Sequence, residues 1–75
     1  MEDLKPFLQE EIANLAFVTV GFDEPLLSSK LLDSISAMDL LVSIEEKIGK
    51  RIPQHLISDG NFDSINIIID TLQKI

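Results

Sequence analysis

The sequence contains no cysteine among its 75 residues. Disulfides, thiolate metal sites and thiol nucleophiles are therefore excluded, and nothing in the composition implies an oxidising compartment. Long apolar runs are also missing, since none approaches the ~20 residues of a membrane-spanning helix. The acidic N-terminal residues lack the basic region of a signal peptide, so we expect a cytoplasmic protein.

Basic residues are scarce: 6 lysines and arginines stand against 13 acidic residues, for a net charge of −7. That charge repels phosphate backbones and anionic lipid, which argues against nucleic-acid and membrane-surface binding. It favours partners with basic surfaces, although solubility alone would also explain it.

Histidine is limited to His55, which follows the helix-breaking Pro53 and is expected in a solvated loop. Metal sites need several convergent ligands, and this lone histidine with scattered acids does not supply them. Asp33 precedes Ser34, but no base is present to activate that hydroxyl. We therefore expect no metal site and no catalytic residue, so the chain is not predicted to be an enzyme.

What is present is a hydrophobic content of 45%, enough for the packed core of a single domain over residues 1–75. The first segment predicts an amphipathic helix over about residues 3–16, with Asp3 as its N-cap and Pro6 in its first turn. Its apolar stripe consists of Leu4, Phe7, Leu8, Ile12 and Leu15.

The next stretch, "VTVGFDEPLLSSK", alternates Val18 and Val20 around a threonine, as a strand would. Gly21 and Pro25 interrupt that pattern, and no second strand is available for pairing. We predict a long loop whose apolar side chains pack against the helices. These side chains are Phe22, Leu26 and Leu27.

Two further helices are predicted. "DSISAMDLLVSIEEKIG" begins with Asp33 as a good N-cap and ends at Gly49. A connection follows, in which Ser58 could cap one short turn through Phe62. The last segment, "NFDSINIIIDTLQKI", favours a strand by propensity, but a cap at Asp63 or Ser64 and a 3.6-residue period favour a helix. The predicted fold is therefore all-α, a small three- or four-helix bundle with a long loop between the first and second helices.

The tripeptide Asp-Ser-Ile occurs twice, at residues 33–35 and 63–65, each time at the start of an apolar run. Both copies are explained as helix starts, because Asp and Ser side chains accept the free N–H groups of a first turn. For Ser64 that explanation is sufficient. The helix after Ser34 is different, because it has two apolar stripes.

The core stripe of that helix consists of Ala37, Leu40, Leu41, Ile44 and Ile48. The second stripe consists of Ile35, Met38 and Val42, interleaved with the acids Asp39, Glu45 and Glu46. A bundle this small cannot easily bury both stripes, so an exposed apolar strip rimmed by acids is expected, as at a partner site. The alternative is that these residues are half-buried at the helix edges.

The stretch "LLDSISAMDLLVSIEEKIGKRIP" resembles the core of acyl and peptidyl carrier proteins. The features shared with that family are Asp33-Ser34-Ile35 at the helix start, Asp39, Glu45-Glu46, Gly49 and the exit Ile52-Pro53. The long first loop and the last helix also match, so the resemblance spans almost the whole chain.

The chain departs from the housekeeping fatty-acid carriers before and after the serine. Leu31-Leu32 replace a glycine and a small residue, Lys30 stands where glycine is frequent, and Ser36 stands where an acid is frequent. The leucine pair is more similar to D-alanyl carriers and to stand-alone carriers of specialised pathways.

The resemblance implies that Ser34 anchors 4′-phosphopantetheine, transferred from coenzyme A by a phosphopantetheinyl transferase, with Asp33 helping to present the serine. The thiol of the arm, which the chain itself lacks, would carry acyl or aminoacyl thioesters. The implied partners are a loading ligase and downstream synthases or transferases of fatty-acid, polyketide or nonribosomal peptide biosynthesis. A monomer is expected.

In this interpretation the apolar strip docks in a groove on each partner, while Asp39, Glu45 and Glu46 meet basic residues around it. For Leu40, Leu41 and Ile44 we favour ordinary core packing over the lining of an acyl cleft. The competing hypothesis is an acidic helical adaptor that binds a partner and is never modified. The sequence does not name the cargo.

Overall fold

The computed structural model describes residues 4–75, and this part of the chain is all-helical with no strand. The main helices are α1 (Leu4–Ala16), α2 (Ser34–Ile48) and α3 (Ile65–Leu72), and two one-turn 3-10 helices, η1 (Gln54–Leu56) and η2 (Asp59–Asn61), lie between α2 and α3. The predicted small helical bundle is confirmed. The proposed N-cap Asp3 lies outside the described residues.

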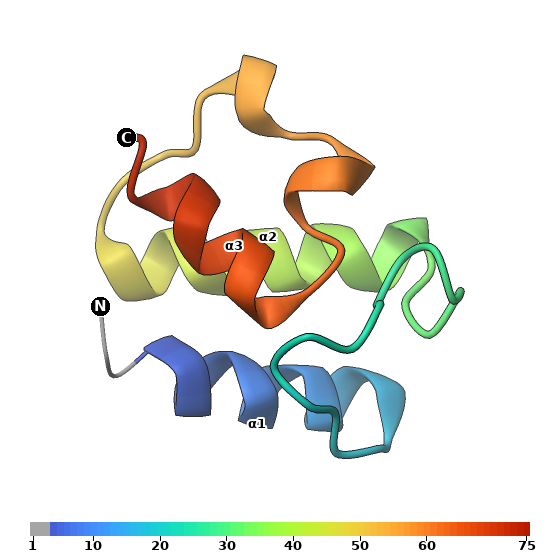
Figure 1. The fold of residues 1–75 in the computed structure, drawn as a ribbon. Coiled ribbons are helices and arrows are strands. Elements are labelled where there is room, and N and C mark those ends of the chain that lie inside the picture. The colour runs from blue at the N-terminus through green and yellow to red at the C-terminus, as the bar shows by residue number, and fades with distance from the viewer. Residues whose placement is uncertain (1–3) are drawn as a thin grey trace.

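The helices form a compact bundle in which α1 packs against both α2 and α3, and α3 packs against η2 (Figure 1). The chain crosses from α1 to α2 through a long loop over residues 17–33, as predicted, and returns through the 3-10 segment. Residues 18–20 form no strand. The isoleucine-rich last segment is helical, so its tertiary position outweighs its strand propensity.

The core is built from aliphatic side chains of all three helices and of the loop. The aliphatic side chains with essentially no exposed surface are Leu8, Ile12, Val20, Leu26, Ile44, Ile65, Ile68 and Leu72. Leu27 is half-buried against this cluster, so the loop is held to the helices as predicted. Phe22 lies at the edge instead, 38% exposed, with the Lys5 ammonium 5.3 Å from its ring centre.

The helix ends follow from local side-chain chemistry. Asp33 Oδ1 accepts a 2.8 Å hydrogen bond from the backbone N–H of Ser36, and α2 ends at Gly49, whose φ of 72° suits glycine. At α3 the cap is Ser64, whose Oγ accepts the N–H of Ile67 at 3.1 Å. Ser58 lies at the N-cap position of η2, the short turn predicted there, and Phe62 ends that turn, but the side chain of Ser58 makes no capping hydrogen bond.

No helix within residues 4–75 has the length and apolar character needed to cross a bilayer.

Candidate functional site

The two Asp-Ser-Ile copies have opposite roles in the structure. In the first copy Asp33 caps α2, which leaves Ser34 exposed at the first helical position. In the second copy Ser64 is the cap and is 4% exposed. The isoleucines differ as well, because Ile35 is 76% exposed while Ile65 is fully buried. Of the two serines, Ser34 therefore presents its hydroxyl to solvent.

Asp33, the residue before Ser34, carries a carboxylate at the start of α2. The backbone N–H of Ser36, followed by the side chain of Ser36, lowers the pKa of Asp33 below its ordinary value of 3.8. The carboxylate is exposed and therefore ionised at neutral pH. A serine and an ionised aspartate thus occupy adjacent positions at the positive end of the α2 dipole.

A cavity of about 460 Å³ opens beside Ser34. Its walls come from the end of the long loop, from the first half of α2 and from residues 57–62. Buried or half-buried side chains such as Leu27, Leu40, Leu41 and Phe62 form its inner part, while Ser34 and other exposed residues form its rim. The size is within the usual range of small-molecule pockets.

This cavity changes the interpretation of the core stripe of α2. Leu40 and Leu41, for which ordinary core packing was favoured, also line the cavity, whereas Ile44 is fully buried and does not. Sequence reasoning also missed the opposite wall, to which Ile57 and Phe62 contribute. The available signal was Ile57, an apolar residue in a polar connection.

The second apolar stripe of α2 is exposed, as predicted. Ile35, Met38 and Val42 are 76%, 59% and 51% exposed, respectively. They form a continuous strip at spacings of three and four residues along the helix, and they begin one residue after Ser34.

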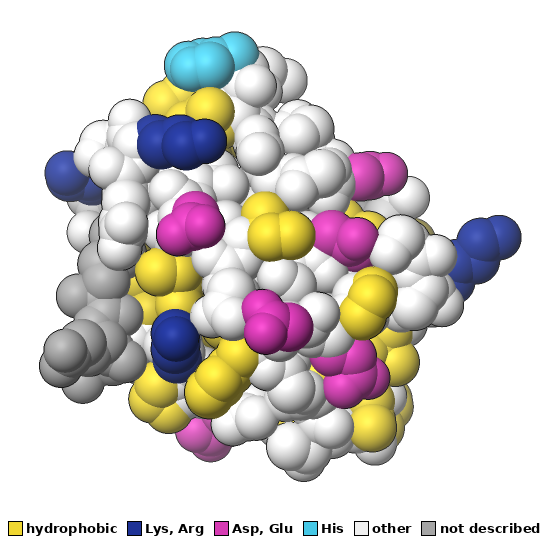
Figure 2. Space-filling view, viewed as in Figure 1, with side chains coloured by type: hydrophobic (Ala, Val, Ile, Leu, Met, Phe, Trp, Pro, Cys, Tyr) yellow, Lys and Arg dark blue, Asp and Glu magenta, His cyan; other side chains and the backbone are white. Residues whose placement is uncertain are grey.

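The three acids assigned to the rim of this strip are not equivalent. Asp39 and Glu46 are exposed, whereas Glu45 is half-buried and its Oε2 accepts the backbone N–H of Ile52 at 2.8 Å. Glu45 therefore fastens the segment after α2, and the freely exposed acids are Asp39 and Glu46. Acidic side chains are also numerous on the face seen in Figure 2, among exposed apolar groups.

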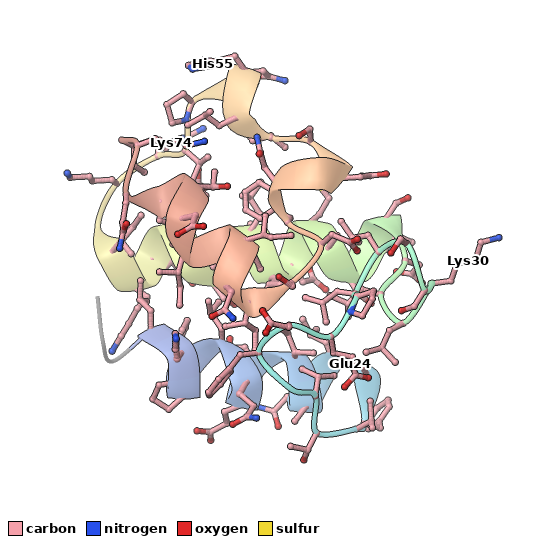
Figure 3. All side chains as sticks on the ribbon, in the orientation of Figure 1. Glu24, Lys30, His55 and Lys74 are labelled. Carbon is pink, nitrogen blue, oxygen red and sulfur yellow. The ribbon has the colours of Figure 1, made fainter. Side chains whose placement is uncertain are left out.

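The basic and histidine side chains near the site are peripheral. Lys30 contributes to the rim of the cavity and extends outward from the loop that precedes α2 (Figure 3). His55 projects from the outer end of the connection, in η1, where it is exposed as expected. Within residues 4–75, no three metal-ligating side chains are gathered in one place.

Comparison with known proteins finds no family model that matches the sequence and no curated protein that is significantly similar to it.

Proposed function

We propose that this chain is a carrier protein that bears 4′-phosphopantetheine on Ser34 and moves acyl or aminoacyl thioesters between the enzymes of a biosynthetic pathway. The observation that supports this most directly is the exposed Ser34 at the first position of α2, with capping taken over by Asp33. A hydroxyl that is not required for the fold is accessible to a modifying enzyme. The exposed position of Ser34 also leaves space for a large substituent on its oxygen.

The modification is a phosphoryl transfer from coenzyme A. The oxygen of Ser34 forms a bond to the phosphorus on the pantetheine side of coenzyme A, and its proton passes to a base of the transferase. The phosphoanhydride P–O bond to the nucleotide breaks, and the nucleotide phosphate leaves with the bridging oxygen and its electron pair. The bound arm supplies a thiol, which the cysteine-free chain lacks. The N-terminal end of α2 favours the phosphate through its dipole and free N–H groups.

Asp33 opposes a phosphate electrostatically, so its role would belong to the transfer step. A carboxylate at this position can share the hydration shell of a Mg²⁺ ion that accompanies coenzyme A. Asp33 is ionised at neutral pH, and its lowered pKa extends the ionised range to more acidic pH.

The exposed strip of α2 is the surface that partner enzymes would bind. Ile35, Met38 and Val42 supply apolar contact area, and the flexible Met38 adapts to grooves of different shape. Asp39 and Glu46 are available for basic residues on the transferase, the loading ligase and downstream enzymes. Charge pairs of this kind steer association and orientation more than they add affinity, which suits a shuttle.

The test is the intact mass of the protein after incubation with coenzyme A and a broad-specificity transferase. The wild type should gain the mass of one phosphopantetheine, and Ser34→Ala should gain none. Ser58→Ala is a matched control, because Ser58 is also exposed, also lines the cavity and caps nothing. Ser64→Ala should be labelled as well, provided that it is folded.

The second candidate is an unmodified acidic adaptor, which the exposed strip alone would support. The same experiment separates the two proposals. An unchanged mass of the wild type, with a known carrier modified in the same tube, rejects the carrier and leaves the adaptor.

A further inference from the structure

Asp63, the first residue of the second Asp-Ser-Ile copy, is bonded to the long loop rather than to its own helix. Its Oδ1 accepts the backbone N–H groups of Leu26, Leu27 and Ser28 at 3.1, 2.8 and 2.8 Å, and its Oδ2 accepts the hydroxyl of Ser28 at 2.8 Å. Its backbone carbonyl accepts Leu26 N–H at 2.7 Å. The side chain of Asp63 thus accepts hydrogen bonds from four donor groups in a segment that lies 35 to 37 residues earlier in the chain.

The segment held in this way is a self-contained turn over residues 25–32. Its internal bonds run from Ser29 Oγ to the Pro25 carbonyl, from Lys30 N to the Leu27 carbonyl and from Leu32 N to the Leu26 carbonyl. The hydrogen bonds that join this turn to other parts of residues 4–75 all end on Asp63. The buried side chains of Leu26 and Leu32 hold it in addition.

This turn is one wall of the cavity beside Ser34, because Leu27, Lys30 and Leu32 line it. The facing wall ends at Phe62, the residue immediately before Asp63. Through its hydrogen bonds Asp63 therefore connects the turn to the chain segment that contributes the other wall.

We propose that Asp63 is a positioning residue that fixes the width of this cavity and so limits the size of the cargo it accepts. The cargo part rests on the proposed carrier function, whereas the effect on the cavity does not. Removing the carboxylate leaves the backbone N–H groups of Leu27 and Ser28 and the hydroxyl of Ser28 without their acceptor, whereas Leu26 N–H keeps the backbone carbonyl of Asp63. The turn would then move away from residues 57–62, and the cavity would widen.

The variants for the test are Asp63→Ala, which removes both acceptor oxygens, and Asp63→Asn, which keeps one neutral acceptor oxygen but loses the charge and the second oxygen, so that its effect should be smaller. The matched control is Asp23→Asn. Asp23 lies in the same loop and accepts a hydrogen bond from the side chain of Asn66 in α3, but it does not line the cavity or bond the turn. The control removes the same charge at the same junction.

The first measurement uses the unmodified protein and does not depend on the carrier hypothesis. Amide exchange at Leu27 and Ser28 should accelerate about tenfold or more in Asp63→Ala, and less in Asp63→Asn, which keeps one acceptor oxygen. A series of free straight-chain and branched alkanols, followed by the methyl NMR shifts of Leu27, Leu41 and Ile57, reports what the cavity accepts. The Asp63 variants should bind longer or more branched alkanols than the wild type and Asp23→Asn do.

The second measurement uses protein loaded on Ser34 with acyl chains of increasing length. The gain in Tm on loading should stop at a shorter chain in the wild type than in Asp63→Asn. A lower Tm with an unchanged size profile, in both measurements, would mean that Asp63 is only structural and would overturn the inference. If Asp63→Ala does not fold, Asp63→Asn decides. If Ser34 cannot be loaded, the carrier proposal fails and the alkanol series still decides the role of Asp63.

Discussion

The backbone N–H of Ile52 donates a 2.8 Å hydrogen bond to Oε2 of Glu45, seven residues earlier in the chain. The bond turns the chain back after α2 ends at Gly49, and it brings Ile52 into the core. It also separates two adjacent glutamates that have the same chemistry. Glu45 is bound within the fold, and Glu46 is exposed.

Glu45→Ala should therefore lower the free energy of unfolding by about 1 to 2 kcal/mol, because the partly buried backbone N–H of Ile52 loses its acceptor. Glu46→Ala should change it by less than about 0.5 kcal/mol. Urea denaturation of both variants measures the difference. Equal effects would show that the bond to Ile52 contributes nothing.

Charge reversal at Glu46 should affect partners rather than folding. Glu46→Lys is expected to slow modification or loading by a cognate enzyme and to weaken the salt dependence of that rate, since one steering charge is inverted. Asp70→Lys, an equal charge change at an exposed position on α3, is the control. Stopped-flow or initial-rate kinetics at several salt concentrations provide the measurement. If both variants respond alike, the α2 strip is not the docking surface.

The two serines should also separate in stability. Ser64→Ala removes the cap of α3 and should cost about 1 kcal/mol, whereas Ser34→Ala should cost much less because Asp33 supplies the cap of α2. Thermal and urea unfolding of the unmodified proteins tests this. A larger loss in Ser34→Ala would contradict the assignment of the two caps.

Phe17 and Lys30 adopt left-handed backbone conformations, with φ of 61° and 63°. Phe17→Gly and Lys30→Gly should each raise the free energy of unfolding by roughly 1 kcal/mol, because glycine relieves the steric cost of this conformation. Phe17 is 91% exposed, so little packing is lost with its ring. Val18→Gly is the control. Val18 is not in the left-handed conformation, so this substitution should lower the free energy of unfolding. A loss of stability in the first two variants would contradict the prediction.

Acid should weaken the fold through Asp33 and Asp63. Hydrogen bonds, first from the backbone N–H of Ser36 and of Ser28 respectively, lower the pKa of each carboxyl below 3.8. Groups with a depressed pKa in the folded state contribute their full stabilisation above the ordinary pKa, and the contribution is lost as the pH falls through the folded value. Stability should therefore decline below about pH 4.

Asp33→Asn and Asp63→Asn should each show a shallower decline over that acid range, because each lacks one of the titrating groups. Urea unfolding between pH 2 and pH 7, roughly the range that spans both protonation states, provides the curves. Curves that run parallel to that of the wild type would exclude the substituted carboxyl as a source of the acid sensitivity.

The features that could be predicted from the sequence are those with local causes. Asp33 and Gly49 mark the ends of α2 because caps act on the adjacent turn. The exposed strip of Ile35, Met38 and Val42 could be predicted because one helix of a small bundle cannot bury two stripes. Only the exposure of the strip is established; its use by partners stays a prediction.

The features that could not be predicted depend on contacts between distant residues. Asp63 and Ser64 were equally good caps by local chemistry, and only the approach of residues 26–28 assigns Asp63 to the loop. Glu45 and Glu46 likewise look equivalent until Ile52 is placed. The cavity is lined by three segments that are separate in the sequence, so it could not be predicted from the residues around Leu41.

The position of Ser34 on the rim of the cavity has a consequence for weak binding. A group attached there through a short flexible arm is confined to a small volume around the opening, at an effective concentration on the order of millimolar. A cavity with only millimolar intrinsic affinity would then be occupied about half of the time. Such a cavity would bind the attached group between encounters with partner enzymes and would still release it to any enzyme that binds it more tightly.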